Sequence, residues 1–103
     1  MTDVVVTRNE DLHRWEARVD GVLAGFAEYR QTDALVIFTH TEVDPSFEGR
    51  GVGTALARHA LDEVADDGTR EVMAVCPFIK GWIAKHPDYQ PLLHSPAPSP
   101  RTD

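Results

Sequence analysis

Two side chains able to accept a proton stand close together in the middle of the sequence. His40 and Glu42 lie in the segment "ALVIFTHTEVD", residues 34–44, whose β-branched residues predict a strand. Residues two apart on a strand share a face, and histidine titrates closest to neutrality. The pair is therefore a candidate general base. The alternative is that both belong to an exposed polar face of a strand.

The single cysteine, Cys76, is a candidate nucleophile at the end of a second predicted strand, residues 70–76. A small fraction of an ordinary cysteine is thiolate at neutral pH, which is enough to accept an acyl group. The alternative is a small buried apolar residue, which is what free cysteine most often is. Thiol-redox chemistry is disfavoured, because the chain has no second cysteine to resolve a disulfide.

Three glycines, Gly49, Gly51 and Gly53, stand in "EGRGVGTAL", directly before a helical pattern. A helix N-terminus carries unpaired N–H groups and a partial positive charge, and therefore suits a phosphate. Glycines at these positions remove the Cβ atoms that would hold a diphosphate away from the backbone, and Arg50 adds a cation. The alternative is a glycine-rich turn that binds nothing.

Two common phosphate motifs do not fit this loop. A Walker A loop ends in Gly-Lys-Ser/Thr, whereas this loop continues Gly51-Val52-Gly53-Thr54 without a lysine. The dinucleotide pattern G-x-G-x-x-G has Thr54 at its third glycine position. It also requires a βαβ unit, and here a run of strands precedes the loop.

The elements around these residues predict an α+β fold. Segments 4–7, 13–20, 22–31 and 34–44 have strand character, with Asp20-Gly21 as a hairpin turn, and predict an antiparallel meander. Residues 52–67 have a helical period, with Gly68 as the residue that ends the helix. The apolar segment 70–76 is typical of a covered inner strand, and residues 78–86 predict a short helix.

The loop "GRGVGTAL" resembles the coenzyme-A pyrophosphate loop of the GNAT N-acetyltransferase superfamily, Q/R-x-x-G-x-G/A. Gly51 and Gly53 fill the glycine places, whereas Glu48 stands where the family has Gln or Arg. With "VCPF" and "HPDYQPLL", the segment from His40 onward is similar in order and spacing to a half-length, single-domain branch of that superfamily. The similarity covers most of residues 13–93.

The resemblance implies an acetyl-CoA-binding core without the N-terminal helices that shape the acceptor site of full-length enzymes. It implies a splay between the strands that end near Asp44 and Cys76, with Cys76 near the thiol of the coenzyme. Tyr89 is the only tyrosine after the second strand, where many family enzymes have a thiolate-protonating tyrosine. The coenzyme-binding residues implied are Val43, Gly49, Arg50, Gly51, Val52, Gly53, Thr54 and Ala55.

Composition sets the remaining expectations. The 103 residues predict one domain, 1–93, followed by a proline-rich disordered tail, 94–103. A net charge of −7 disfavours nucleic acid or an anionic membrane as a partner. The single cysteine and the lack of a long apolar segment predict a cytoplasmic protein. No metal is expected, because His59, His86 and His94 lack short paired spacing with one another or with Cys76. The exposed edge strands of a meander allow a homodimer as well as a monomer.

Two functions of different classes follow. The first is an acetyl-CoA-dependent N-acetyltransferase that acts on an unidentified amine, with Cys76, Glu42 and His40 as candidate catalytic residues. The second is a coenzyme-A-binding module without turnover. The absence of an acceptor pocket favours the second, and the three candidate catalytic residues favour the first.

Overall fold

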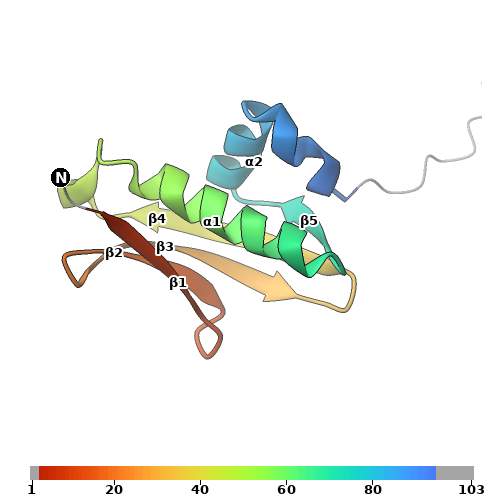
Figure 1. Ribbon diagram of the computed structural model, residues 1–103, viewed down its shortest axis with the longest axis horizontal. Coiled ribbons are helices and arrows are strands. Elements are labelled where there is room, and N and C mark those ends of the chain that lie inside the picture. Colours follow the sequence, from red (N-terminus) through yellow and green to blue (C-terminus); the bar gives the residue numbers. More distant parts are fainter. Residues whose placement is uncertain (1–2, 95–103) are drawn as a thin grey trace, which may run out of the picture.

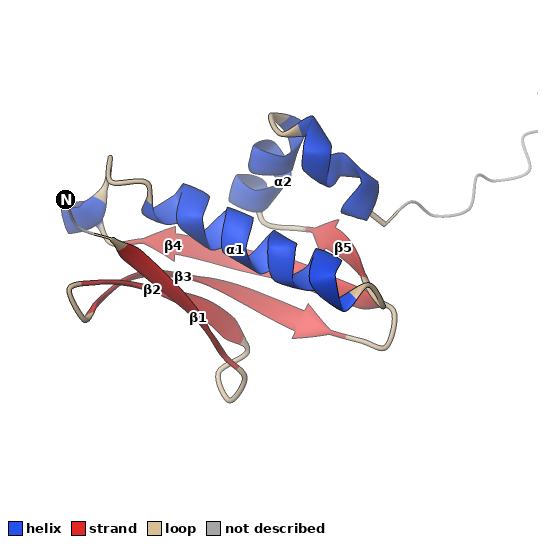
Figure 2. Cartoon of the chain, in the orientation of Figure 1, coloured by secondary structure: helices blue, strands red, loops and turns tan. Residues whose placement is uncertain are grey.

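A computed structural model describes residues 3–94 of the chain as one five-stranded sheet with helices packed against it (Figures 1 and 2). The strands lie in sequence order, and the first four pair antiparallel, which confirms the predicted α+β meander. After a helical crossover, β5 pairs parallel to β4. The elements are β1 Val4–Asn9, β2 Arg14–Val19, β3 Val22–Gln31, β4 Leu35–Val43, η1 Pro45–Phe47, α1 Val52–Asp67, β5 Glu71–Ala74, α2 Pro77–Ala84 and η2 Pro87–Leu92.

Helix α1 covers an apolar face of the sheet. Side chains alternate between the two faces of a strand, so apolar residues at every second position gather on one face. Trp15, Ala17 and Val19 are buried on that face, as the alternation of segment 13–20 predicts. Helix α1 contributes the predicted apolar stripe to the same core, made of Val52, Leu56, Ala57, Ala60, Leu61 and Val64. The opposite face of the sheet carries no helix among the described residues (Figure 1).

The turns and helix ends follow from local chemistry. Asp20 and Gly21 both have positive φ, 52° and 81°, which is the backbone of a tight hairpin turn. Helix α1 ends at Gly68, whose left-handed backbone lets its N–H bond to the carbonyl of Val64. Helix α2 begins with Pro77, which fits the first helical position because its missing N–H needs no partner there.

The prediction of a covered inner strand at 70–76 is wrong in its position. β5 is shorter, Glu71–Ala74, and lies at the edge of the sheet, where only β4 forms a ladder with it. Val72 is buried, but Met73 is 37% exposed and Val75 is 58% exposed. The apolar residues of this segment therefore reflect a strand that is buried on one face only.

The C-terminal end of the described chain returns to this edge. Leu93 forms a parallel bridge with Val72, and the N–H of His94 donates to the Val72 carbonyl over 2.7 Å. The remainder of the tail predicted as disordered, residues 95–103, lies outside the described residues.

Candidate functional site

Strands β4 and β5 separate halfway along β4. Their last paired residues are Phe38 and Ala74, after which the N–H groups of Val75 and Cys76 both donate to the Phe38 carbonyl over 2.9 and 3.0 Å. From there β4 continues to Val43 with β3 on one side and no strand on the other, while the segment after β5 turns into α2. The structure therefore contains the splay that the family resemblance implied.

The glycine loop lies at the end of the unpaired part of β4 and opens helix α1. Gly49 and Gly51 have φ of 80° and 76°, a left-handed backbone that glycine adopts without strain. The first helical hydrogen bond runs from the N–H of Ala55 to the Gly51 carbonyl, over 2.9 Å. Among the described residues, the N–H groups of the first helical turn, 52–54, have no partner, and no acidic side chain lies in that turn.

Gly53 is needed for a different reason, because the ring of Phe78 from α2 lies against it. A Cβ atom built on Gly53 would come within 2.6 Å of the ring's Cζ, closer than real Cβ atoms approach. No such contact exists at Gly49 or Gly51, whose Cβ positions face open space. The two left-handed glycines shape the loop, and Gly53 allows α1 and α2 to meet.

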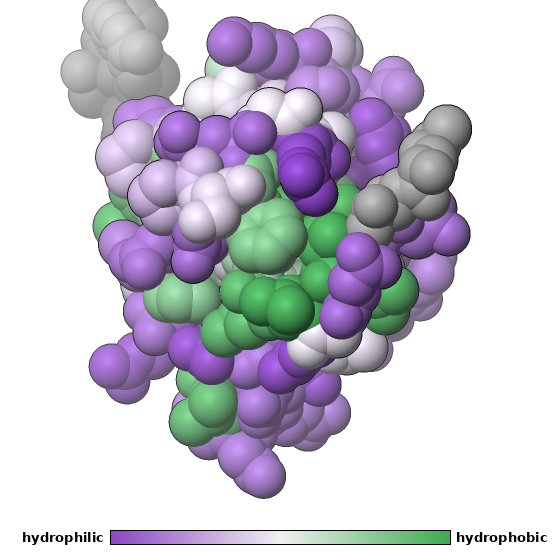
Figure 3. All heavy atoms as spheres, turned by 90° about the vertical axis from the view of Figure 1, so that its left-hand side faces the viewer, coloured by the Kyte–Doolittle hydropathy of each residue, from purple (hydrophilic) through white to green (hydrophobic). Residues whose placement is uncertain are grey.

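A groove of about 230 Å³ runs along this loop. We call it the loop groove; it is lined by Val43, Phe47, Glu48, Gly49, Gly51, Val52, Gly53, Thr54 and Phe78. Arg50 stands beside it, with its guanidinium 5.7 Å from the centre of the Phe47 ring. Figure 3 views this end of the molecule and shows hydrophobic residues gathered at its centre with hydrophilic residues around them. The groove thus combines unpaired N–H groups with an apolar wall.

His40 and Glu42 lie together on the face of the sheet opposite α1. The ring Nε2 of His40 is 3.2 Å from a Glu42 carboxylate oxygen, and both side chains are exposed. The register places Glu42 beside Phe26 and His40 beside Glu28 on β3. The predicted sharing of one face is therefore observed, and these two residues are accessible to a ligand approaching the open side.

Cys76 lies in the splay but contacts neither His40 nor Glu42. The residue is 3% exposed, and its sulfur lies 3.3 Å from the hydroxyl of Thr41 and accepts the N–H of Ile79 over 3.4 Å. Thr41 belongs to the row of β4 that faces α1, between the two outward-facing residues. The three candidate catalytic residues therefore lie near residues 40–42 of β4. His40 and Glu42 are on its open face, and Cys76 is on the face toward the helices.

Tyr89 of η2 and Trp82 of α2 both contact side chains of α1. The Tyr89 hydroxyl donates to Asp62 of α1 over 2.7 Å, and this hydrogen bond raises the pKa of Tyr89 above its ordinary value. Trp82 is buried, as expected for a core residue, and stacks on His86 at 3.7 Å between ring centres. No group of three potential metal ligands occurs within residues 3–94.

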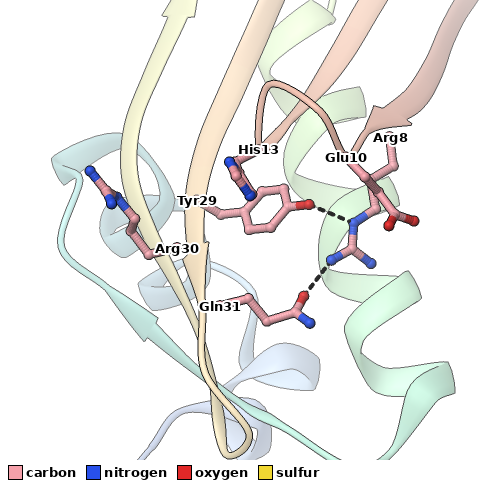
Figure 4. A pocket seen from close by; sticks show the side chains of 6 residues that line it. All are labelled: Arg8, Glu10, His13, Tyr29, Arg30 and Gln31. Carbon is pink, nitrogen blue, oxygen red and sulfur yellow. Dashed lines mark hydrogen bonds between the residues drawn. The ribbon is translucent and has the colours of Figure 1, made fainter.

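A separate polar cavity of about 410 Å³ lies by Arg8, His13 and Tyr29, among the residues drawn in Figure 4. The Arg8 guanidinium donates to the Tyr29 hydroxyl and to Glu63 of α1, both over 2.9 Å, and to Gln31. All three of its nitrogens are paired, so this cluster ties β1 and β3 to α1. It shares no residue with the loop groove.

Several known structures share this fold. Over 100% of both chains, the protein resembles a GCN5-like protein from Staphylococcus aureus, with a TM-score of 0.69 and 19% identity. It resembles ribosomal-protein-alanine N-acetyltransferase from Brucella melitensis biovar Abortus 2308 over 99% of this chain and 97% of that one, with a TM-score of 0.59 and 15% identity. AAC(6')-Iy, in complex with the bisubstrate analogue CoA-S-monomethyl-acetylneamine, matches over 92% of each chain, with a TM-score of 0.55 and 17% identity.

The sequence assigns the family. The model of the GCN5-related N-acetyl-transferase family matches residues 14–92, and the chain belongs to that family. A search of curated proteins found no match. No helix within residues 3–94 is both long and apolar enough to span a membrane.

Sequence analysis missed two residues of the site. Thr41 contacts Cys76, and Phe78 contacts Gly53. Neither stands in the glycine loop, and the two contacts link residues 35 and 25 positions apart, so the spacing of motifs could not reveal them.

Proposed function

We propose that the protein binds acetyl-CoA with the pyrophosphate at the start of helix α1 and transfers the acetyl group to an amine. The observation that carries the proposal is the unpaired first turn of α1, residues 52–54, opening onto the loop groove beside the unpaired edge of β4. Family membership supports the reaction class.

The residues present fit a diphosphate group. Three unpaired N–H groups and the positive end of a 16-residue helix favour an anion, and Arg50 adds a cation. Glu48 is the one acid of the groove and opposes that charge. The coenzyme-contacting residues in this proposal are the ones expected from the sequence: Val43, Gly49, Arg50, Gly51, Val52, Gly53, Thr54 and Ala55.

The bound acetyl-CoA supplies the thioester, and the side chains of the protein handle protons. A lysine-like amine has a pKa near 10.4, so its deprotonation at pH 7 costs roughly 4–5 kcal/mol without help. His40, held by Glu42, is the proposed base for an amine on the open face. Since Thr41 and Cys76 lie on the other side of β4, the proposed base and the thiol flank the splay from two sides.

Cys76 has two roles compatible with this proposal. As an acyl acceptor, its thiolate would be held by the Ile79 N–H and the Thr41 hydroxyl. As a structural residue, it caps α2, since the same sulfur already accepts that N–H. The two roles differ in whether an acetyl group ever resides on the sulfur.

A coenzyme-binding module without turnover is the second candidate. It is favoured by one observation: the side chains of His40 and Glu42 are exposed on the open face of the sheet, whereas Cys76 is buried on the other side of β4. An acceptor amine would bind on an open sheet face rather than in a pocket.

Titration calorimetry with acetyl-CoA tests the binding half of the proposal. We expect saturable binding to the wild-type protein. Gly53→Val should abolish binding, because its side chain occupies the loop groove. Arg50→Gln should weaken binding, because it removes the positive charge beside the groove. Arg30→Gln is the matched control, since Arg30 is an exposed arginine outside the groove. Wild-type protein that binds no acetyl-CoA at millimolar concentration would refute both candidate functions.

Single-turnover mass spectrometry tests the transfer half. The protein is mixed with acetyl-CoA, quenched, and digested to locate any added acetyl group. Acetyl on Cys76, passed on to an added amine, supports transfer through the thiol. Transfer that persists in Cys76→Ala and falls in His40→Gln supports direct attack by the amine. Coenzyme binding with no transfer to any of a panel of amines favours the non-catalytic module.

A further inference from the structure

The open face of the sheet has a groove between β3 and β4, near the end of β4. We call it the strand groove; its volume is about 170 Å³, and its lining includes Leu23, Phe26, Glu42, Asp44 and Pro45. It shares Glu42 with the His40–Glu42 pair, which contains the proposed base. It shares no residue with the loop groove. A ligand in the strand groove therefore lies beside the proposed base and leaves the loop groove free for the coenzyme.

The two grooves lie on opposite sides of the same stretch of chain. Side chains alternate along a strand, so Glu42 and Asp44 line the strand groove, while Val43 between them lines the loop groove. Asp44 continues the extended backbone of β4, with φ −60° and ψ 129°. Beyond Phe38, the edge of β4 that faces away from β3 has no strand beside it among the described residues. Two ligands, one in each groove, can therefore meet across this free edge.

The charge of the strand groove favours a cation. Two carboxylates line it, those of Glu42 and Asp44, and no basic side chain of the described residues does. One oxygen of Glu42 lies 3.2 Å from Nε2 of His40, and one oxygen of Asp44 accepts the N–H of Ser46 over 2.8 Å. Within residues 3–94, the second oxygen of each carboxylate has no hydrogen-bond partner. Both are thus able to accept hydrogen bonds from a ligand.

Apolar side chains form the wall beside these carboxylates. Leu23 is 36% exposed and Phe26 is half-buried, so both offer surface to a ligand. The guanidinium of Arg14 lies 4.6 Å from the centre of the Phe26 ring, but its charge is paired with Glu16 over 2.8 Å. An apolar wall with a few polar groups that fix orientation is typical of a small-molecule site. This layout suits an ammonium group carried on a carbon chain.

We infer that the strand groove binds the acceptor, and that the acceptor is an ammonium ion on an apolar chain, without a carboxylate next to its nitrogen. Glu42 and Asp44 hold the charge, and Leu23 and Phe26 contact the chain. A carboxylate beside the nitrogen, as in a free amino acid, is repelled by both acids. This inference rests on the proposed function, because it takes acetyl-CoA as the donor and His40 as the base.

His40 and the leaving sulfur together take the two protons that the ammonium ion loses. Since a carboxylate only accepts hydrogen bonds, Glu42 accepts the Nε2–H of His40, which leaves Nδ1 able to take a proton. His40 removes the first proton from the ammonium ion. The neutral amine then forms a bond with the acetyl carbon as the carbon–sulfur bond breaks, and the sulfur takes the second proton from the nitrogen.

Matched amines with and without a carboxylate test the charge preference. We expect the wild-type protein to acetylate phenethylamine with a kcat/KM about 3- to 10-fold above that for phenylalanine, the effect of exposed charges at short range. In Asp44→Asn this ratio should fall at least about 2-fold, through a higher KM for phenethylamine at unchanged kcat. Asparagine also accepts an N–H in the place of Asp44, so the turn at Ser46 is kept. Asp33→Asn, an exposed acid outside the groove, is the control and should keep the ratio.

Leu23→Thr gives a second measurement that does not depend on charge. We expect the ratio of kcat/KM for phenethylamine to that for ethylamine to fall at least about 3-fold, because less apolar surface is buried against the phenyl group. Val22→Thr is the control, since Val22 is the exposed neighbour of Leu23 and does not line the groove. Urea unfolding of both variants checks that they remain folded.

An NMR titration of the isotope-labelled protein with phenethylamine, in the presence of coenzyme A, locates the amine without turnover. We expect the largest shifts at the N–H groups of residues 23–26 and 42–44. These residues belong to the two strands that form the groove.

Two results would overturn the inference while leaving the proposed function intact. One is acetylation of amines with the same ratios in the wild type, Asp44→Asn and Leu23→Thr. The other is an NMR response to phenethylamine that lies outside the strand groove. If acetyl-CoA binds but none of these amines is acetylated, the transfer half of the proposed function fails, and the inference fails with it.

Discussion

The hydroxyl of Thr41 lies 3.3 Å from the sulfur of Cys76, across the opening between β4 and the start of α2. Thr41 is half-buried and Cys76 is buried, so the contact between their polar atoms lies largely out of solvent. The contact joins the strand that precedes the glycine loop to the helix that follows β5. It also gives the thiol a hydrogen-bond partner that a wholly apolar site would not provide.

We predict that Thr41→Val slows acetylation of Cys76 by acetyl-CoA by roughly 3- to 10-fold, the effect of losing one hydrogen bond of about 1 kcal/mol. Valine keeps the shape of the residue while removing the hydroxyl. The rate is measured by quenched single-turnover mass spectrometry. Thr39→Val is the control, because Thr39 bonds to the Glu28 carbonyl instead. Equal rates in both variants would show that Thr41 does not assist the thiol.

The contact between Gly53 and Phe78 predicts strong coupling in a double-mutant cycle. Gly53→Ala should destabilise the fold by about 1 kcal/mol, because the new methyl group forces the ring of Phe78 to move. In a Phe78→Ala background the same change should be neutral or stabilising, since alanine is the better helix former. Urea unfolding of the four proteins measures the coupling, which we expect at about 1–2 kcal/mol. Additive effects would contradict this contact.

Glu63 should matter for stability more than its place on the surface of α1 suggests. Its carboxylate accepts the indole N–H of Trp15 over 3.1 Å and a guanidinium N–H of Arg8 over 2.9 Å. Glu63→Ala leaves the buried Trp15 N–H without that partner, which costs about 1–3 kcal/mol. Asp66→Ala on the same helix, an exposed position, should change the free energy of unfolding by no more than about 0.5 kcal/mol. A similar loss in both variants would argue against a special role for the cluster.

Protonation of Glu16 should lower the free energy of unfolding in acid. It is buried on the open face; burial alone raises the pKa of its carboxyl, but hydrogen bonds from Arg14 and Arg18 outweigh this and lower that pKa below its ordinary value. The folded state therefore favours the carboxylate. Its contribution is fully present above the unfolded-state pKa of about 4.3 and is lost as the pH falls through the lower folded-state pKa.

The free energy of urea unfolding, measured between pH 7 and pH 3, checks this sign. At pH 7 we expect Glu16→Gln to be less stable than the wild type by about 1–3 kcal/mol, and the gap to narrow steadily below pH 4.3. Glu28→Gln, at a half-buried position on the same face, is the control and should show a smaller gap at pH 7. A gap that widens in acid would contradict the lowered pKa.

Local sequence chemistry predicted most of the secondary structure. The alternation of residues 13–20, the helical stripe from Val52 to Val64 and the Asp20-Gly21 turn all reappear, because each depends on residues near one another in the chain. The glycine loop was predicted at the start of α1 for the same reason. Segment 70–76 was misplaced, since the apolar pattern of a strand does not reveal how many strands lie beside it.

The face on which His40 lies was decided by the tertiary structure. The pairing of β3 with β4 shifts by one residue between Glu28 and Tyr29, so that Phe38 and Thr41 both face α1, and His40 faces away from it. Without that bulge, Phe38 and His40 would share a face, because side chains alternate along a regular strand. The register of two strands is set by packing across the whole sheet, and nothing in "FTHTE" alone fixes it.

The sequence by itself determined that a strand, a glycine loop and a helix follow one another, because turn chemistry and periodicity are local. Only the tertiary structure decided which residues surround that loop. The meetings of Thr41 with Cys76 and of Gly53 with Phe78 join positions 35 and 25 residues apart. They arise because the crossover through α1 returns the chain to β4, and the parallel pairing that results depends on the packing of the whole sheet against its helices.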